Sequence, residues 1–400
     1  MLLAGCISTA GRESKMADRK KKRSTKRQQQ KRKLIIFGVE ILSVLLLLGL
    51  LYVWSIVSKM QVDSGFDNSE AGINEDIAEE TLETLEGYTN IAIFGLDNRA
   101  QGKYSQGLSD VIMIASINNK TKEVKLVSVY RDTYLSIGGG KFNKCNSAYA
   151  KGGVKQAVQM LNANLDLNIK EYLCVDWGAV TEAVDALGGV EIEITKQEAE
   201  QINQYIWEVD QMLGTKSEFV SGAGKKLLTG TQATTYARIR KTAGNDFKRT
   251  SRQRIVIEAM LNKAKQSDIK TLLGICDAVF DDIATSLTIT EIAALVKDVQ
   301  KYEIGSTSGF PFKITGAQLA DAGDAVVPIV LEENVKDLHK YLFGTEDYVP
   351  SNTVKAISDA IIQKTGVVAG TPSVNVDSYN DTAGQSGTVF KDPEDTQKED

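Results

Sequence analysis

The sequence predicts an α/β fold: a mixed central β-sheet covered by helices on both faces, preceded by a single transmembrane helix. Three short apolar runs open the predicted domain, and helical and extended patterns alternate after them. This mixed order is typical of a sheet with helices packed on both sides. The transmembrane helix is predicted from one long apolar stretch near the N-terminus.

Residues 34–57 form that stretch, LIIFGVEILSVLLLLGLLYVWSIV, in which Glu40 is the one charged residue. About 20 apolar residues are enough for a helix to cross a bilayer, and Tyr52 and Trp54 suit the interface at its far end. Residues 19–33 contain ten Lys and Arg and no acid. Because basic flanks stay in the cytoplasm, we expect a single-pass cell-membrane protein with a cytoplasmic N-terminus and an extracellular C-terminal domain.

Charge is distributed unevenly along the chain. Residues 1–33 carry twelve Lys and Arg against Glu13 and Asp18, and the whole chain has a net charge of −5, which leaves −15 for the remainder. An acidic outer domain argues against nucleic acid as a partner. The membrane is the partner that the basic tail predicts.

The cysteines and the histidine indicate neither a disulfide framework nor a histidine-based catalytic site. Cys6 ends MLLAGC, which resembles a lipoprotein signal, but five residues are too few for the apolar region of such a signal. We therefore interpret Met16 as the natural start. The other three cysteines lie among apolar or small neighbours, which predicts buried thiols. His339, the one histidine, is predicted to be a packed structural side chain.

Composition divides the chain into a basic cytoplasmic tail, the transmembrane helix, an extracellular stalk, a folded domain and a disordered acidic tail, at residues 1–33, 34–57, 58–87, 88–366 and 367–400. The stalk and the acidic tail are polar and lack strong apolar periodicity. A folded part of nearly 280 residues is ample for one large core.

Three strands are predicted first, at Asn90–Asp97, Asp110–Ile117 and Val124–Asp132. The second and third are separated by a short polar connection that suits a hairpin. In a three-stranded meander, the end of the first strand, the start of the second and the end of the third share one rim. Asp97, Asp110 and Arg131 would then lie close together.

Further elements follow in alternation: helices at 153–165 and 177–187, strands at 171–177 and 190–194, a long helix from about Thr250, a helix capped by Thr288 and Glu291, a strand at 326–331 and a closing helix from about Ser351.

A second group of charges lies in YARIRKTAGNDFKRTSRQR, residues 236–254. Arg238 and Arg240 point the same way if their segment is extended. Arg249, Arg252 and Gln253 fall at helical i, i+3 and i+4 spacing near a predicted helix start, where the backbone amides also attract anions. Either a solvated surface or an anion site would fit these spacings. Arginine favours the second, because its planar fork meets phosphate oxygens in pairs.

Next to the aspartate rim, these arginines have the composition of a phosphoryl-transfer site, in which carboxylates hold a divalent cation and arginines neutralise the phosphate oxygens. No nucleophilic side chain is evident, so the acceptor hydroxyl would come from a second substrate.

The same residues carry a family resemblance. The runs NIAIFGLDNR, SDVIMIASINNKTKEVKLVSVYRDTY, KCNSAYAKGG, VDALGGVEI and GTQATTYARIRKTAGNDFKRTSRQR occur in the order typical of the LytR-CpsA-Psr family of Gram-positive envelope proteins. The resemblance covers roughly residues 88–366 and weakens after 265. The short cytoplasmic tail and the single span also match the family layout.

This resemblance implies a phosphotransferase that moves an anionic glycopolymer, such as a teichoic acid or a capsule, from undecaprenyl pyrophosphate to peptidoglycan through a phosphodiester link. By resemblance, Asp97 and Asp110 hold Mg²⁺, with Mn²⁺ as a second candidate, and Asp110 and Arg131 are catalytic. The pyrophosphate-binding set is Arg131, Arg238, Arg240, Arg249 and Gln253. Lys144 and Asn146 match the K-x-N motif of the family, with a structural or peripheral role as open as a catalytic one.

Two positions depart from the family pattern. Leu108 stands where many members have an arginine, which removes one phosphate contact, and Tyr130 replaces the proline before Arg131. Two alternatives to the transferase stay open: a lipid pyrophosphate hydrolase that uses water as the acceptor, and a non-enzymatic protein that binds envelope glycans.

Overall fold

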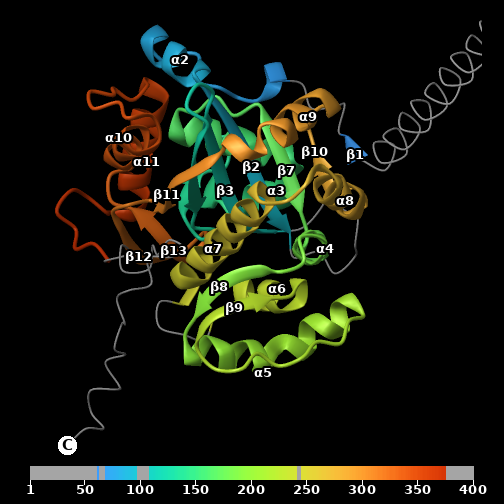
Figure 1. Cartoon of the computed structure of the whole chain (residues 1–400). Coiled ribbons are helices and arrows are strands. Elements are labelled where there is room, and N and C mark those ends of the chain that lie inside the picture. Colours follow the sequence, from blue (N-terminus) through green and yellow to red (C-terminus); the bar gives the residue numbers. More distant parts are fainter. Residues whose placement is uncertain (1–60, 63–67, 97–107, 241–244, 375–400) are drawn as a thin grey trace, which may run out of the picture. The chain divides into compact units, whose positions relative to one another are not determined.

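A computed structural model describes residues 61–62, 68–96, 108–240 and 245–374 (Figure 1). The chain divides into two units after Ser58, and every described residue belongs to the second unit. The predicted span at 34–57 and Asp97 lie outside the described residues. No helix within the described ranges is long and apolar enough to cross a membrane.

The centre of the domain is a seven-stranded mixed sheet, as predicted. The strand order is β1 (Gln61–Val62), β10 (Ile283–Thr285), β7 (Glu171–Val175), β2 (Tyr88–Leu96), β3 (Ser109–Asn118), β4 (Glu123–Val129) and β11 (Glu303–Phe310). Strands β2, β3 and β4 form the expected antiparallel meander. Parallel strands extend it on both sides, β7 next to β2 and β11 next to β4.

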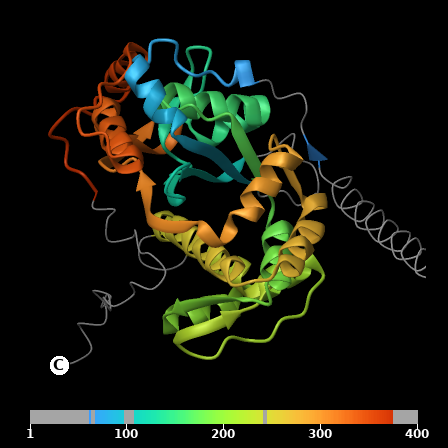
Figure 2. The same ribbon diagram turned by 45° about the horizontal axis from the view of Figure 1, so that its top comes forward.

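Helices cover both faces of the sheet (Figures 1 and 2). Because side chains alternate along a strand, Ile112 and Ile114 of β3 enter one core and Met113 and Ala115 enter the other. The first core is completed by α3 (Asn146–Leu165), α10 (Leu331–Phe343) and α11 (Asn352–Thr365). The second core packs against α7 (Asn245–Lys265) and α9 (Ile289–Lys297).

A further hydrophobic core lies beside the sheet, and its elements carry most of the residues of the candidate site. It is built from α4 (Trp177–Ala186), β8 (Val190–Ile194), α5 (Lys196–Leu213), β9 (Gly224–Leu228), α6 (Gly230–Arg238) and the middle of α7. Strands β8 and β9 form an antiparallel hairpin. Capping boxes at Thr195 and Thr229 fix the starts of α5 and α6, and the predicted box of Thr288 and Glu291 is also present.

Smaller elements complete the domain. They are the hairpins β5 (Tyr134–Ser136) with β6 (Phe142–Lys144) and β12 (Ile314–Leu319) with β13 (Gly323–Pro328), the helices α2 (Glu79–Glu86) and α8 (Ile269–Val279), and three 3₁₀ turns at Asn68–Glu70, Phe280–Asp282 and Val299–Lys301.

The predicted domain boundaries need correction at both ends. In the segment predicted as a stalk, Ala71 and Leu85 are buried in the first core, which also contains α3, α10 and α11. The Asn74 amide donates to Asp166 at 2.6 Å. Apolar residues in this segment are too widely spaced to show periodicity. At the other end, Val367 is buried and the backbone N–H of Val374 donates to Ile314 O at 2.8 Å, so the domain continues past residue 366.

Two element ends also differ from prediction. The third predicted strand ends at Val129 instead of Asp132, because the chain turns there and the N–H of Thr133 donates to Tyr130 O. Helix α7 begins at Asn245, about one turn before the predicted start. As a result, Arg131 lies on a turn after β4, and Asp246 lies in the first turn of α7.

His339 is a packed structural residue, as predicted. It is 1% exposed, its ring stacks on Tyr348 with centroids 3.7 Å apart, and Nε2 hydrogen-bonds Leu165 O at 2.9 Å. Burial lowers the pKa of His339 to about 4, despite opposing contributions from Leu165 and Asp166.

This pKa predicts a pH-dependent stability. The unfolded chain protonates the ring below about pH 6.5 and the folded chain only below about 4, so native stability falls as pH drops through that window. We expect His339→Ala to cost on the order of 3 kcal/mol at neutral pH and to flatten the loss between pH 6.5 and 4. Thermal unfolding of both proteins across that range measures this; an unchanged pH slope in the variant would contradict it.

Candidate active site

The predicted rim of charges forms at the sheet. Leu96, the last residue of β2, pairs with Ser109 at the start of β3, and Arg131 follows the end of β4. Arg131 Nη1 lies 2.7 Å from Asp110 Oδ1. The predicted proximity of Asp110 and Arg131 is thus confirmed, whereas Asp97, the third predicted member, lies outside the described residues.

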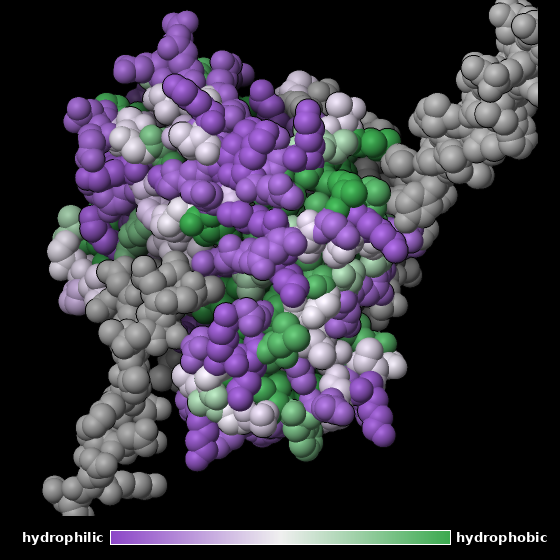
Figure 3. Space-filling model, viewed as in Figure 1, coloured by the Kyte–Doolittle hydropathy of each residue, from purple (hydrophilic) through white to green (hydrophobic). Residues whose placement is uncertain are grey.

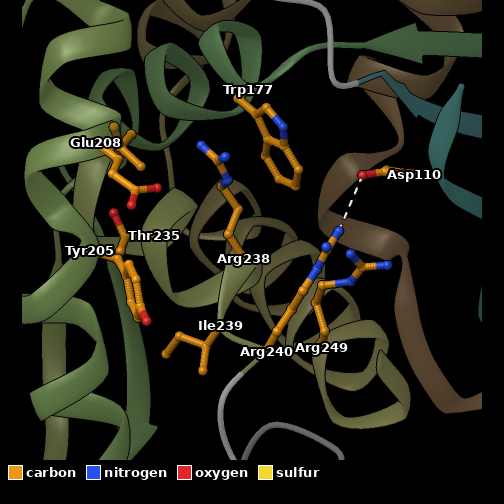
Figure 4. A pocket seen from close by; sticks show the side chains of 10 residues that line it. Asp110, Trp177, Tyr205, Glu208, Thr235, Arg238, Ile239, Arg240 and Arg249 are labelled. Atoms are coloured by element: carbon orange, nitrogen blue, oxygen red, sulfur yellow. Dashed lines mark hydrogen bonds and ion pairs between the residues drawn. The ribbon is translucent and has the colours of Figure 1, made fainter. Parts of the chain in front are cut away.

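Three of the predicted arginines approach this rim, Arg238 from α6, Arg240 from the segment after it and Arg249 from α7. Arg238 is the last residue of α6, and Ile239 after it is extended with φ −57° and ψ 126°. Arg240 Nη2 lies 3.4 Å from Asp110 Oδ2. Arg249, in the second turn of α7, is buried with 4% of its side chain exposed. In Figure 4 all three arginines line the same pocket as Asp110.

Asp246 is a central residue that the sequence reasoning missed. Its carboxylate lies 3.0 Å from Arg131 Nε, 3.2 Å from Arg249 Nη2 and 3.7 Å from Arg240 Nε. Its position three residues before Arg249, in the first turn of a helix, was the available signal, because acids favour helix starts and pair at i+3. The contacts with Arg131 and Arg240 depend on the tertiary fold.

Burial and charge act in opposite directions on the arginines. Burial lowers the pKa of Arg249 to about 10, which Asp246 counteracts and the neighbouring Arg131 and Arg240 reinforce. For Arg131, burial also disfavours the charge, but Asp110 and Asp246 outweigh it and raise its pKa. Both guanidinium groups therefore stay charged at neutral pH, with the Nε of Arg249 lacking a hydrogen-bond partner within the described residues.

The arginines border a pocket of about 250 Å³ (Figure 4). Trp177 from α4 and Tyr205 and Glu208 from α5 form its other wall. The guanidinium of Arg238 lies over the Trp177 ring at 5.5 Å and makes no ion pair within the described residues. A cation that is held by an aromatic face and not by a carboxylate can still bind an incoming anion. The pocket is therefore suited to a phosphate-bearing ligand.

Arg131 is not itself a lining residue of the pocket, and two other predicted positions also lie away from its wall. Arg252 is buried in a different contact, with Nε 2.8 Å from Glu198 Oε1 and Nη1 3.1 Å from Ile239 O, so the expectation that it shares an anion-binding face with Arg249 was wrong. It supports the backbone between Arg238 and Arg240. Gln253 is 6% exposed and is not a lining residue, and its Nε2 has no hydrogen-bond partner within the described ranges.

The K-x-N motif supports the turn that carries Arg131. Lys144 Nζ lies 3.2 Å from Asp132 Oδ1, and the backbone N–H of Asn146 donates to Arg131 O at 3.1 Å. Tyr130, which replaces the family's proline, packs edge-on against Phe247 with centroids 4.7 Å apart. These contacts connect the end of β4 to the first turn of α7, where Asp246 lies.

Among the predicted metal ligands, Asp110 is described and Asp97 lies outside the described residues. The described residues contain no group of three or more His, Cys, Asp or Glu side chains that could hold a metal ion. Asp110 supplies carboxylate oxygens at the pocket wall. Mg²⁺ is commonly held by one or two carboxylates together with substrate phosphates, and Asp110 suits that donor set.

The fold is shared with solved structures. TagT bound to LI-WTA superposes with a TM-score of 0.52 at 21% identity, covering 66% of this chain and 93% of that chain. Crystalline Bacillus subtilis TagV gives the same TM-score at 24% identity, covering 66% of this chain and 98% of that chain.

Sequence comparison agrees with the structural one. The chain is 29% identical over 270 residues to the polyisoprenyl-teichoic acid–peptidoglycan teichoic acid transferase TagU of Enterococcus faecalis, covering 66% of this chain and 82% of the relative. The model of the LytR-CpsA-Psr family matches residues 56–336, which is most of the chain and includes every described residue of the pocket. The protein is therefore a member of the LytR-CpsA-Psr family.

Proposed function

We propose that this protein is a membrane-anchored phosphotransferase that moves an anionic glycopolymer from polyprenyl pyrophosphate to peptidoglycan. The observation that carries the proposal is the pocket that Arg238, Arg240 and Arg249 line together with Asp110. Such a cluster neutralises a pyrophosphate, and the hydroxyl side chains among the described wall residues are those of Tyr205 and Thr235. The names of the transferase relatives support the same donor and acceptor.

The reaction is a displacement at phosphorus. The acceptor hydroxyl of peptidoglycan forms a bond to the phosphorus that bears the sugar, the bond from that phosphorus to the bridging oxygen breaks, and polyprenyl phosphate leaves. Arg238 and Arg240 stabilise the charge that develops on the phosphate oxygens, and Arg131, 2.7 Å from Asp110, holds that carboxylate in position. Asp110 accepts the hydroxyl proton, since it lines the pocket whereas Asp246 does not.

Asp110, together with Asp97, would hold Mg²⁺ or Mn²⁺ against the pyrophosphate. The ion would supply positive charge to the leaving group. The protein residues position the donor: Arg249, 3.2 Å from Asp246, provides a buried cation in the pocket wall.

Incubation of the lipid-linked donor with and without peptidoglycan tests the reaction. We expect glycopolymer to become attached to peptidoglycan, and EDTA to abolish attachment until Mg²⁺ is restored. Release of polymer phosphate at the same rate with or without peptidoglycan would identify a hydrolase instead. Full transfer in EDTA would exclude the proposed ion, and no reaction under any condition would favour a glycan-binding protein.

We also propose that residues beyond about 60 lie outside the cell, because the basic segment 19–33 precedes the predicted span. External protease added to intact protoplasts should remove the domain. A cytoplasmic protein in the same protoplasts serves as the control for lysis, and complete protection of the domain would overturn the topology.

A further inference from the structure

Two short helices contain many apolar residues, and the fold buries almost none of them. Helix α8 reads IKTLLGICDAV, yet only Leu272 is buried, and α9 reads ITEIAALVK with no buried residue. By contrast, α10 buries six of its residues. Ile269 and Ile289, at the starts of the two helices, are 61% and 46% exposed. Exposed apolar clusters of this kind mark interaction surfaces.

The exposed residues form a stripe on each helix. Their spacing is i, i+4 and i+7, which places them on one face, and all are exposed or half-buried: Ile269, Leu273 and Cys276 on α8, and Ile289, Ala293 and Val296 on α9. Other sides hold the helices on the domain, since Ile275 and Leu295, roughly 120° around each helix from the stripe, pack against the cores. Figure 3 shows apolar surface over this corner, bordered by polar side chains.

The position of the stripes in the chain indicates what covers them. Strand β10 connects α8 to α9, and its Ala284 pairs with Gln61 of β1. In Figures 1 and 2 these four elements lie together at one edge of the domain. The predicted span ends at Val57, four residues before Gln61. Four residues of extended chain reach at most about 14 Å, so this edge is held close to the bilayer surface.

We propose that the two stripes form a membrane-docking surface that enters the outer face of the bilayer beside the anchor. This inference rests on the membrane anchor of the proposed function and not on the transfer reaction. Amphipathic helices that lie in the interface bury their apolar face by about 5–10 Å. Docking would fix the orientation of the domain above the membrane.

The charges of the two helices predict which lipids are needed. Lys270 and Lys297 are balanced by Asp277 and Glu291. Docking is therefore driven by apolar burial, and zwitterionic phosphatidylcholine suffices. Anionic phosphatidylglycerol should not strengthen docking, because Asp281 and Asp282 follow α8 directly.

The test uses the full chain in phosphatidylcholine vesicles with an environment-sensitive fluorescent amino acid at position 289. The matched control carries the same probe at Leu227, an exposed apolar residue of β9 that is 59% exposed. Lipids with a nitroxide on the acyl chain should quench the probe at 289 and leave the probe at 227 bright. Leu273→Asp with Val296→Asp should abolish the quenching, with circular dichroism confirming the fold.

Three outcomes would contradict the docking surface. The first is a probe at 289 that stays bright in a folded, reconstituted chain, and the second is equal quenching at both positions. The third is a blue-shifted probe at 289 that lipid does not quench, which would indicate that a second copy of the chain covers the surface. Carbonate extraction of the same vesicles tests the anchor separately, and transfer activity tests the proposed reaction. A failure of either is therefore distinguished from a failure of the docking surface.

Discussion

Arg131→Ala should lower glycopolymer transfer on the order of 10²–10³-fold while the domain stays folded. Arg131 pairs more closely with both site carboxylates than Arg240 does, with Asp110 at 2.7 Å and Asp246 at 3.0 Å against 3.4 Å and 3.7 Å for Arg240. Its removal takes away the positive charge beside Asp110 and releases that carboxylate from its fixed position. Transfer of a lipid-linked polymer to peptidoglycan measures the loss.

The control is Lys225→Ala, which breaks an ion pair with Glu191 in which both side chains are more than half exposed. Such surface pairs contribute little to stability, so transfer and thermal unfolding should match the wild type. Near-normal transfer by a folded Arg131→Ala protein would remove Arg131 from the mechanism. If Arg131→Ala unfolds at the assay temperature, transfer by Arg131→Lys is measured in its place, because lysine keeps the charge and loses the paired hydrogen bonds.

The sheet and its rim could be predicted because they follow from local patterns. Apolar runs and a short polar connection set the meander, and the register of a meander brings Asp110 and the end of β4 to one edge. The convergence of Asp110 with Arg131 needed no knowledge of distant contacts. Helix caps were predictable for the same reason, since a capping box spans only four residues.

The rest of the site depends on packing between separate cores. Asp246 contacts Arg131, which lies 115 residues away in the chain, and no local pattern predicts that pairing. Trp177, Tyr205 and Glu208 reach the pocket only because the core of α4, α5 and α6 packs beside the sheet. Arg252 shows the opposite failure, because helical spacing alone cannot tell a ligand-facing arginine from one that pairs with Glu198 inside a core.

Arg238→Ala should also reduce transfer on the order of 10²–10³-fold, and Arg238→Lys should restore only part of the loss. Arg238 is the pocket arginine whose described partner is an aromatic face, with its guanidinium 5.5 Å from the Trp177 ring. Its hydrogen-bond donors are therefore available for the pyrophosphate. Lysine keeps the positive charge but loses the planar fork that meets two phosphate oxygens at once.

The two substitutions separate charge from geometry. Because Arg238 makes no ion pair with a described carboxylate, its removal leaves no buried acid unpaired, and thermal unfolding should stay close to the wild type. Trp177→Phe keeps an aromatic face with a weaker attraction for the cation and should lower transfer less than Arg238→Ala does. If Arg238→Lys matches the wild type, the residue acts as a simple point charge, and if folded Arg238→Ala transfers normally, the donor pyrophosphate does not bind at this arginine.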